Sequence, residues 1–435
     1  MASIGIVGAG TAGLHLGLKL LSQGIPVTLY AEQEPDALRT GRLLNTVTHH
    51  APTRTREREL YVDFWGAPEL AMNRCAIHVH GPHPFSLKGR VSEPSLCVDY
   101  RLYQPRLAEA FVERGGRLEV MPVDLAALEG LTRRHALVVV ATGRSGLNTL
   151  FPRVPELSPH DKPPRVLFAS MLKGLRMPEP FGMHVNLVPG QGEVFESQII
   201  TRHGRVPSTL IEAIPGTELA SMISRKRDDD PAGFDKMLLE LMRRHAPATY
   251  ERIDPTEFGV RGPLDFLQGG FTPMVRRAWA QVGEGRFVMT VGDTHVTNDP
   301  IAGQGANAAS ASAFTLAIAI QDALLSERPF DEKFCRDTET RMWAAVAPAT
   351  DWTNALLQPP PPHVIDLLVA GSRDNRVADA IVSAFMIPER ILGACASPEA
   401  AAEFIAQAGT PSAEVLAASG ALGWDTGARI RPLAG

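Results

Sequence analysis

Short apolar runs alternate with helical periodicity at the start of the chain. Residues 3–7 form an apolar run rich in β-branched side chains, and residues 27–30 form a second one. Between them, apolar residues at positions 14, 18 and 21 fall on one face of a helix. This order predicts a β-α-β unit. Similar runs at 137–141 and 287–291 predict two further buried strands of a parallel sheet.

The middle of the chain has a different pattern. Residues 165–215 contain several short runs with strand character, such as 208–214, punctuated by Gly and Pro. Within residues 233–245 the apolar positions recur at helical spacing and predict one amphipathic helix. These features indicate a second, sheet-based domain inserted into the first.

The last third of the chain is apolar and Ala-rich. Residues 304–325 are apolar over a length typical of a buried helix, so their leucines and alanines are predicted core. After residue 330 the pattern is helical, with a rigid break at Pro359–Pro362. The whole pattern predicts an α/β fold: a Rossmann-type domain, an inserted sheet domain and a helical C-terminal region.

Composition narrows the class of protein. A chain of 435 residues is too long for one compact core and predicts two or three domains. The net charge of -5 gives no reason to expect nucleic acid or an anionic membrane as a partner. No signal peptide fits before the first strand, and no apolar run looks long enough to span a bilayer, so we expect a soluble, cytoplasmic protein. The cysteines are far apart, which argues against a thiolate metal site or a dithiol centre, and we predict no metal: Cys75, Cys97, Cys335 and Cys395.

A glycine-rich turn follows the first predicted strand. Gly8 permits the tight turn, Gly10 lets a pyrophosphate approach the backbone, and Gly13 lets helix and strand pack closely. Thr11 and Ala12 open the helix, whose amides would face the phosphates. The second strand ends at Glu32, which can bind both ribose hydroxyls. The context predicts dinucleotide binding; a glycine turn that binds nothing is the alternative.

A second glycine-rich turn indicates which dinucleotide binds. Asp293 follows the strand at 287–291 and can accept hydrogen bonds from a sugar-alcohol chain, which a nicotinamide cofactor lacks. The turn after it opens another helix, whose amides would face the flavin's pyrimidine end. These features favour FAD over NAD, with an ordinary surface loop and helix cap as the alternative. The predicted flavin contacts in this turn are Pro300, Gly303, Gln304, Gly305, Ala306 and Asn307.

Four segments together resemble the styrene and indole monooxygenases, the two-component FAD-dependent epoxidases. They are residues 8–18 (Gly-Ala-Gly-Thr-Ala-Gly-Leu-His-Leu-Gly-Leu), 43–47 (Leu-Leu-Asn-Thr-Val), 98–105 (Val-Asp-Tyr-Arg-Leu-Tyr-Gln-Pro) and 299–307. The resemblance extends more loosely from residue 1 to about residue 390. It implies an aromatic hydroxylase-like FAD-binding domain with these divisions: FAD-binding domain 1–75, 97–168 and 281–330; substrate domain 76–96 and 169–280; C-terminal helical region 331–435.

The resemblance also implies roles for single residues. Arg42 and Arg101 would lie along the FAD chain, and we expect Leu44 and Val123 to contact the cofactor as well. The predicted substrate-pocket residues beside the flavin are Asn45, Val47, His49 and Ser95. Without the resemblance, the two arginines would be interpreted as surface ion-pair partners. Likewise His49 would be one of a satisfied polar pair with His50, and Asn45 a turn cap.

Two positions depart from the styrene-oxidising members. Met72 and Cys75 stand where those members typically have Tyr and His. The departure leaves the chemistry intact but leaves the substrate open among an aryl alkene, indole and a larger indole-type compound. The resemblance implies epoxidation with O₂, and we expect sulfoxidation of aryl thioethers as well.

The supply of electrons follows from the number of nucleotide modules. Only one Gly-x-Gly-x-x-Gly unit is present, so a separate NADH-dependent flavin reductase is expected to deliver FADH₂. The resemblance also suggests a homodimer. Three alternatives stay open: a single-component NAD(P)H-dependent aromatic hydroxylase, a natural-product indole oxygenase, and a non-catalytic flavin-binding protein.

Overall fold

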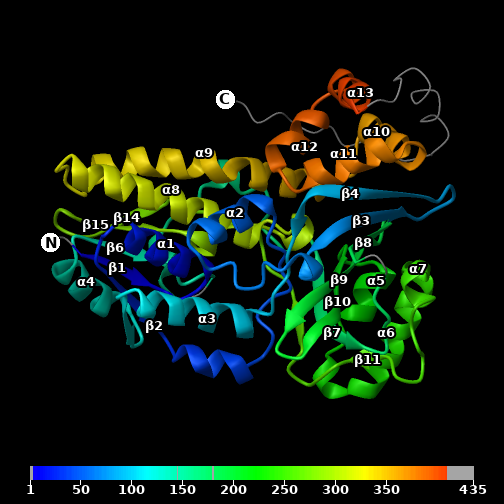
Figure 1. Ribbon diagram of the computed structural model, residues 1–435, viewed down its shortest axis with the longest axis horizontal. Helices are drawn as coiled ribbons and strands as arrows, with labels where there is room; N and C mark the ends of the chain where they lie inside the picture. Colours follow the sequence, from blue (N-terminus) through cyan, green and yellow to red (C-terminus); the bar gives the residue numbers. More distant parts are fainter. Residues whose placement is uncertain (1–2, 145, 179–180, 409–435) are drawn as a thin grey trace.

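Two large sheets and a set of long helices make up the protein (Figure 1). The computed structural model describes residues 3–144, 146–178 and 181–408. The first sheet combines strands from residues 4–140 with two strands from residues 279–290. The second sheet lies beside it and combines two strands from residues 72–95 with strands from residues 166–269 (Figure 1).

The first sheet has six strands in the order β14-β15-β6-β1-β2-β5. Five of them run parallel, and β14 pairs antiparallel with β15 at one edge. The predicted β-α-β unit is confirmed, as are the strands predicted at 137–141 and 287–291. The strands are β1 (Ile4–Val7), β2 (Val27–Ala31), β5 (Arg117–Val120), β6 (Leu137–Val140), β14 (Trp279–Gly283) and β15 (Arg286–Thr290).

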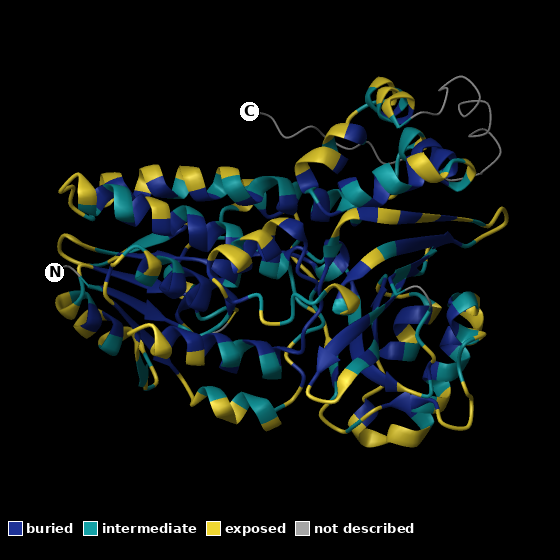
Figure 2. Ribbon diagram, in the orientation of Figure 1, coloured by how far each residue is buried: buried dark blue, intermediate teal, exposed yellow. Residues whose placement is uncertain are grey.

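Helices cover both faces of this sheet because its strands are apolar on both sides. Val139 packs in a core with α1, α3 and α8, whereas its neighbours Val138 and Val140 pack on the opposite side with α4. The helices are α1 (Thr11–Ser22), α2 (Ala51–Glu59), α3 (Tyr100–Glu113), α4 (Leu125–Arg134), α8 (Gly305–Leu325) and α9 (Glu332–Leu356). Figure 2 shows the sheet as buried and the outer face of α9 as largely exposed.

Helix α8 corrects one prediction. By length and composition its 21 residues could cross a membrane, with a mean hydropathy of 1.5, so the expectation that no apolar run is long enough was wrong. The same helix packs against α1 on one side and α9 on the other. In its most apolar 18-residue window, 61% is buried, as predicted for a core helix at 304–325.

The second sheet is ordered β11-β7-β10-β9-β8-β3-β4, with β12 also pairing β7. Its pairs are antiparallel except β3 with β8. The expected strand at 208–214 belongs to β10, and the expected amphipathic helix at 233–245 is α6. The strands are β3 (Met72–Val79), β4 (Phe85–Ser95), β7 (Val166–Lys173), β8 (Met183–Val188), β9 (Gly192–Thr201), β10 (Gly204–Ala213), β11 (Gly259–Val260) and β12 (Phe266–Gly269).

Helices cover this second sheet as well. One face packs Phe168, Ile211 and Leu238 together under α5 (Glu218–Ile223), α6 (Pro231–His245) and α7 (Pro247–Tyr250). A short pair of strands, β13 (Met274–Val275) and β16 (Val296–Thr297), lies outside both sheets.

Up to residue 408, where the described part of the chain ends, four helices follow the predicted proline break. Helix α9 ends at Leu356 and the next helix begins at Pro362, so the break at Pro359–Pro362 is confirmed. These helices are α10 (Pro362–Arg373), α11 (Asn375–Phe385), α12 (Pro388–Ala394) and α13 (Pro398–Gln407). Of these, α10 and α11 pack on β4, at the edge of the second sheet (Figure 1).

Candidate active site

A cavity of about 1060 Å³ is lined by residues of both sheets, by the loops between them and by Phe385 of the C-terminal helix α11. One part of its wall is made of polar and glycine-rich loops at the carboxyl ends of the first sheet's strands. This part includes Gly8, Gly10, Thr11, Glu32, Thr142 and Asp293. The other part is apolar and includes Met183, Phe195, Leu210, Leu267, Phe271 and Phe385. A long ligand with one polar and one apolar end fits such a wall.

The first glycine turn has the geometry that a pyrophosphate needs. Gly8 has φ +116, and a Cβ there would lie 2.3 Å from the carbonyl oxygen of Ala141. A Cβ on Gly13 would lie 2.0 Å from the carbonyl oxygen of Gly8. At Gly10, by contrast, the nearest described atom would be 3.9 Å away, at Nε2 of Gln104. Gly8 and Gly13 are therefore needed for packing, whereas Gly10 leaves the backbone open to a ligand. Helix α1 begins there without a side-chain cap, so its first amides can bind phosphate.

Two carboxylates suit the sugar parts of a dinucleotide. Glu32 follows β2 and Asp293 follows β15, and both line the cavity. Enclosure by the protein raises the pKa of the Asp293 carboxyl, although Arg144 lies 4.0 Å away. Val123 and Leu44 line the same cavity, and so does Ala12.

The turn before α8 also borders the cavity. Pro300, Gly303, Gly305 and Ala306 line it, and Gly303 takes the left-handed conformation with φ +62. Helix α8 has no side-chain cap at its start, so its first amides suit the anionic edge of a reduced flavin. The residues present on this wall therefore fit FAD from the phosphates to the ring system.

Gln304 and Asn307 are buried and are not among the lining residues. Asn307 donates from Nδ2 to the carbonyl oxygens of Thr48 and Gly303, at 2.9 and 2.8 Å. Its Oδ1 accepts from the backbone N–H of His50 at 3.0 Å and from the hydroxyl of Thr53 at 2.7 Å. Asn307 thus fixes the segment at 45–50 to α8.

The two arginines expected along the FAD chain lie outside the cavity wall. Arg42 is partly exposed, pairs with Asp228 at 3.6 Å and stacks over Phe266. Arg101 pairs with both Asp99 and Asp265 at 2.8 Å. These contacts match the ion-pair alternative, and cofactor contact by either arginine stays a prediction.

The expected pocket segment divides into lining and supporting residues. Asn45 and Val47 line the cavity, and Asn45 also caps the local turn by accepting from the Val47 N–H at 3.2 Å. His49 and Ser95 are buried and are not among the lining residues. Ser95 lies 3.0 Å from Nδ1 of His50, which does line the cavity. His50 was missed because nothing in the local pattern distinguishes it from His49.

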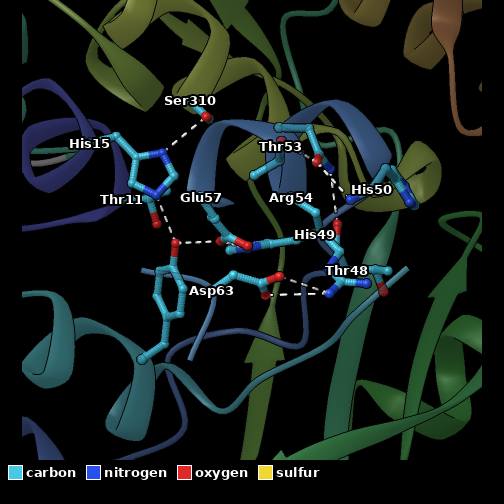
Figure 3. Close-up of polar contacts among 12 residues, drawn as sticks. Thr11, His15, Thr48, His49, His50, Thr53, Arg54, Glu57, Asp63 and Ser310 are labelled. Carbon is cyan, nitrogen blue, oxygen red and sulfur yellow. Dashed lines mark hydrogen bonds and ion pairs between the residues drawn. The ribbon is translucent and has the colours of Figure 1, made fainter. Parts of the chain in front are cut away.

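His49 belongs to a buried polar network (Figure 3). Its Nδ1 lies 2.6 Å from Glu57 and its Nε2 2.7 Å from the Tyr100 hydroxyl, so both ring nitrogens are occupied. Burial opposes ionisation of Glu57, but His49 beside it lowers the pKa of that carboxyl overall. Thr11 donates to Tyr100 at 3.0 Å, which connects His49 to the glycine-rich turn at residues 8–13.

The network continues away from the cavity. Tyr103 donates to Glu57 at 2.7 Å and lies 2.7 Å from Nε2 of His15, whose Nδ1 lies 2.9 Å from Ser310. Burial lowers the pKa of His15 to about 4, so this ring is neutral near pH 7. The chain of contacts joins α1, α2, α3 and α8 behind the polar, glycine-rich part of the cavity wall.

Met72 and Cys75 are buried core residues and are not among the lining residues. Met72 packs with Leu43 and Met171, and Cys75 with neighbouring strand residues such as Val185. Their departure from the family pattern therefore changes packing behind the wall.

Sequence relatives identify the family. Residues 143–252 match a domain described as "Styrene monooxygenase A putative substrate binding domain". The styrene monooxygenase StyA of Pseudomonas fluorescens is 38% identical over 400 residues, covering 91% of this chain and 95% of the relative. A styrene monooxygenase StyA from Pseudomonas sp is also 38% identical, covering 93% and 97%.

Solved structures with lower identity share the fold. The flavin-dependent brominase Bmp2 has a TM-score of 0.58 at 14% identity, covering 96% of this chain and 98% of its own. A flavoprotein/dehydrogenase from Cytophaga hutchinsonii has a TM-score of 0.62 at 13% identity, covering 88% and 92%. Aklavinone-11 hydroxylase, solved with FAD and aklavinone, has a TM-score of 0.56 at 16% identity, covering 81% and 68%. The predicted fold class and family resemblance are confirmed: the chain belongs to the styrene monooxygenase family and is an FAD-dependent monooxygenase.

Proposed function

We propose that the chain epoxidises styrene-like aryl alkenes or indole, using reduced FAD and O₂. The observation that carries this proposal is one continuous cavity that joins a phosphate-binding turn to an apolar, aromatic wall. When bound, reduced FAD supplies two electrons and activates O₂; one oxygen atom passes to the carbon–carbon double bond and the other leaves as water.

The residues of the chain would hold and shield the reactants. Gly10 and Thr11 bind the pyrophosphate, while Glu32 and Asp293 accept hydrogen bonds from hydroxyl groups of the cofactor. The apolar wall binds the aromatic ring and excludes water, which keeps activated oxygen from being lost as hydrogen peroxide. Asn45 and Val47 lie on the same wall, from which they would orient the substrate. His49 and Ser95 would not contact the substrate. They would position side chains that line the cavity, Tyr100 and His50 respectively.

We infer that a separate NADH-dependent flavin reductase supplies the reduced cofactor. The sequence carries one glycine-rich dinucleotide turn, at residues 8–13, which the FAD pyrophosphate would occupy. The purified chain with FAD should therefore consume NADH only at a negligible rate. Rapid consumption would instead support a single-component hydroxylase.

The deciding experiment combines the chain, FAD, NADH and a generic flavin reductase, with styrene or indole as substrate. Styrene oxide or indigo should form only when both proteins are present. Thioanisole in the same assay tests sulfoxidation. Hydrogen peroxide without any oxygenated product would contradict the epoxidase proposal while leaving FAD binding intact.

Three further expectations are part of this proposal. The chain would act in the cytoplasm and form a homodimer. Its domains would divide as an FAD-binding part (1–75, 97–168 and 281–330), a substrate part (76–96 and 169–280) and a C-terminal helical part (331–435). Size-exclusion chromatography with light scattering tests the dimer, and limited proteolysis tests the domain boundaries.

A further inference from the structure

Helix α11 covers the edge of the second sheet. Strand β4 is the last strand in that sheet, so its outer backbone groups need partners. Asp379 accepts from the backbone N–H of Arg90 at 2.6 Å, and Ser383 accepts from that of Ser92 at 2.9 Å. The Ser383 hydroxyl also donates to the carbonyl oxygen of Arg90 at 3.3 Å. Because residues four apart share a helix face, these two side chains can accept hydrogen bonds from alternate residues of the strand, Arg90 and Ser92.

Close packing reinforces this contact. A Cβ on Gly89 of β4 would lie 2.5 Å from the carbonyl oxygen of Ala378 on α11. The glycine therefore allows the helix backbone to approach the strand directly. These contacts fix the distance of α11 from β4, through Gly89, and its position along the strand, through Asp379 and Ser383.

The C-terminal end of α11 reaches the cavity. Phe385 lines the cavity, and its ring meets that of Trp352 edge-on at a centroid distance of 5.5 Å. It packs in one cluster with Ile301 of the turn before α8 and with Phe195 of β9. The next residue, Met386, accepts a weak hydrogen bond from Ser95 at 3.8 Å. Phe385 thus lies where the turn before α8, the second sheet and the C-terminal helices meet.

We propose that Phe385 sets the size of the aromatic ring system that the apolar part of the cavity accepts. This inference rests on the proposed function, because it assigns that apolar part to the substrate. The ring of Phe385 is held by Trp352 behind it and by the fixed position of α11, so a larger substrate cannot displace it easily. Shortening this side chain would open space for a second fused ring.

The test compares one-ring and two-ring ligands in Phe385→Ala, Phe385→Leu and Phe385→Trp variants. Dissociation constants of ethylbenzene and 2-ethylnaphthalene are measured on the FAD-loaded, oxidised protein by titration calorimetry. Turnover of styrene and 2-vinylnaphthalene is measured with a flavin reductase. We expect Phe385→Ala to favour the two-ring ligand by about tenfold or more relative to wild type, and Phe385→Trp to disfavour it. Phe385→Leu should give a smaller shift in the direction of Phe385→Ala, and it replaces that variant if Phe385→Ala does not fold.

Phe404→Ala is the matched control. Phe404 packs in the same apolar cluster but is not among the cavity-lining residues. It should leave the ratio of the two dissociation constants unchanged. Equal shifts in Phe404→Ala and Phe385→Ala, or no shift in any Phe385 variant, would overturn the inference. Wild-type protein that binds both probes but oxygenates neither alkene would contradict the proposed function alone, since the binding ratios still test Phe385.

Discussion

At the scale of single residues, the three glycines of the first turn differ in what they contribute. Gly10→Val should leave the fold intact, because the residue has an ordinary negative φ of -78 and no described atom closer than 3.9 Å to its Cβ position. It should abolish FAD binding by filling the path of the pyrophosphate. Flavin fluorescence titration and thermal unfolding of the apoprotein check the two parts. Gly13→Ala is the contrast: it should destabilise the apoprotein itself, since its Cβ would lie 2.0 Å from a carbonyl oxygen.

Asn45 provides the second prediction at this scale. Its side chain lies on the cavity wall and makes one local bond, to the Val47 N–H. Asn45→Ala should therefore preserve FAD affinity and lower the yield of oxygenated product per hydrogen peroxide formed. Both products are measured in the reductase-coupled assay. Unchanged coupling and selectivity would show that Asn45 does not orient the reactants.

At the scale of elements, Asn307 holds the pocket segment on helix α8. Asn307→Ala removes four hydrogen bonds, three of them buried, and leaves the backbone groups of Thr48 and His50 without these partners. We expect the free energy of unfolding to fall by about 2–4 kcal/mol, measured by urea denaturation. A loss below about 0.5 kcal/mol would mean that the segment keeps its place without this contact.

Two side chains of helix α11, beside the close packing at Gly89, help to hold it on β4. The double variant Asp379→Ala and Ser383→Ala leaves the N–H groups of Arg90 and Ser92 without these acceptors. Because both groups lie near the surface, we expect a modest loss of about 1–2 kcal/mol in stability. Hydrogen exchange of Arg90 and Ser92 should become faster, whereas exchange in the first sheet should not change. Uniform acceleration throughout the protein would point to global destabilisation instead.

At the scale of the whole molecule, buried neutral histidines predict sensitivity to mild acid. Burial lowers the pKa of His15 and His295 to about 4 and that of His50 to about 3, from an ordinary value of 6.5. In this range the unfolded chain binds more protons than the native one. The stability that these rings contribute is therefore complete above pH 6.5 and is lost as the pH falls towards 4.

The size of the effect can be isolated with one variant. A buried histidine whose pKa falls from 6.5 to about 4 lowers the free energy of unfolding by about 2 kcal/mol between pH 7 and pH 5. Burial raises the pKa of the Glu212 carboxyl, which acts in the opposite direction. His15→Gln should therefore show a smaller loss of unfolding free energy between pH 7 and pH 5 than wild type, by about 2 kcal/mol. Equal losses in both proteins would mean that His15 is protonated in the native state.

The sequence by itself determined the features that depend on neighbouring residues. The strand, glycine turn and helix at residues 4–22 follow from local periodicity and from the positive φ at Gly8, which glycine adopts without strain. The position of Asp293 after β15 and the turn that opens α8 also follow from the local sequence. Because these features lie within a few residues of a strand end, the two glycine-rich turns and the carboxylates that line the cavity could be predicted from the local sequence.

Only the tertiary structure decided which side chains of the predicted pocket segment reach the cavity. His49 and His50 are adjacent, yet His49 is enclosed by Glu57 and Tyr100 while His50 lines the cavity. Their directions depend on Asn307, which is 257 residues away from His50. Phe385 likewise reaches the cavity only because α11 packs on β4. Contacts between residues so distant in sequence leave no periodic signal, because they arise from the packing of whole elements.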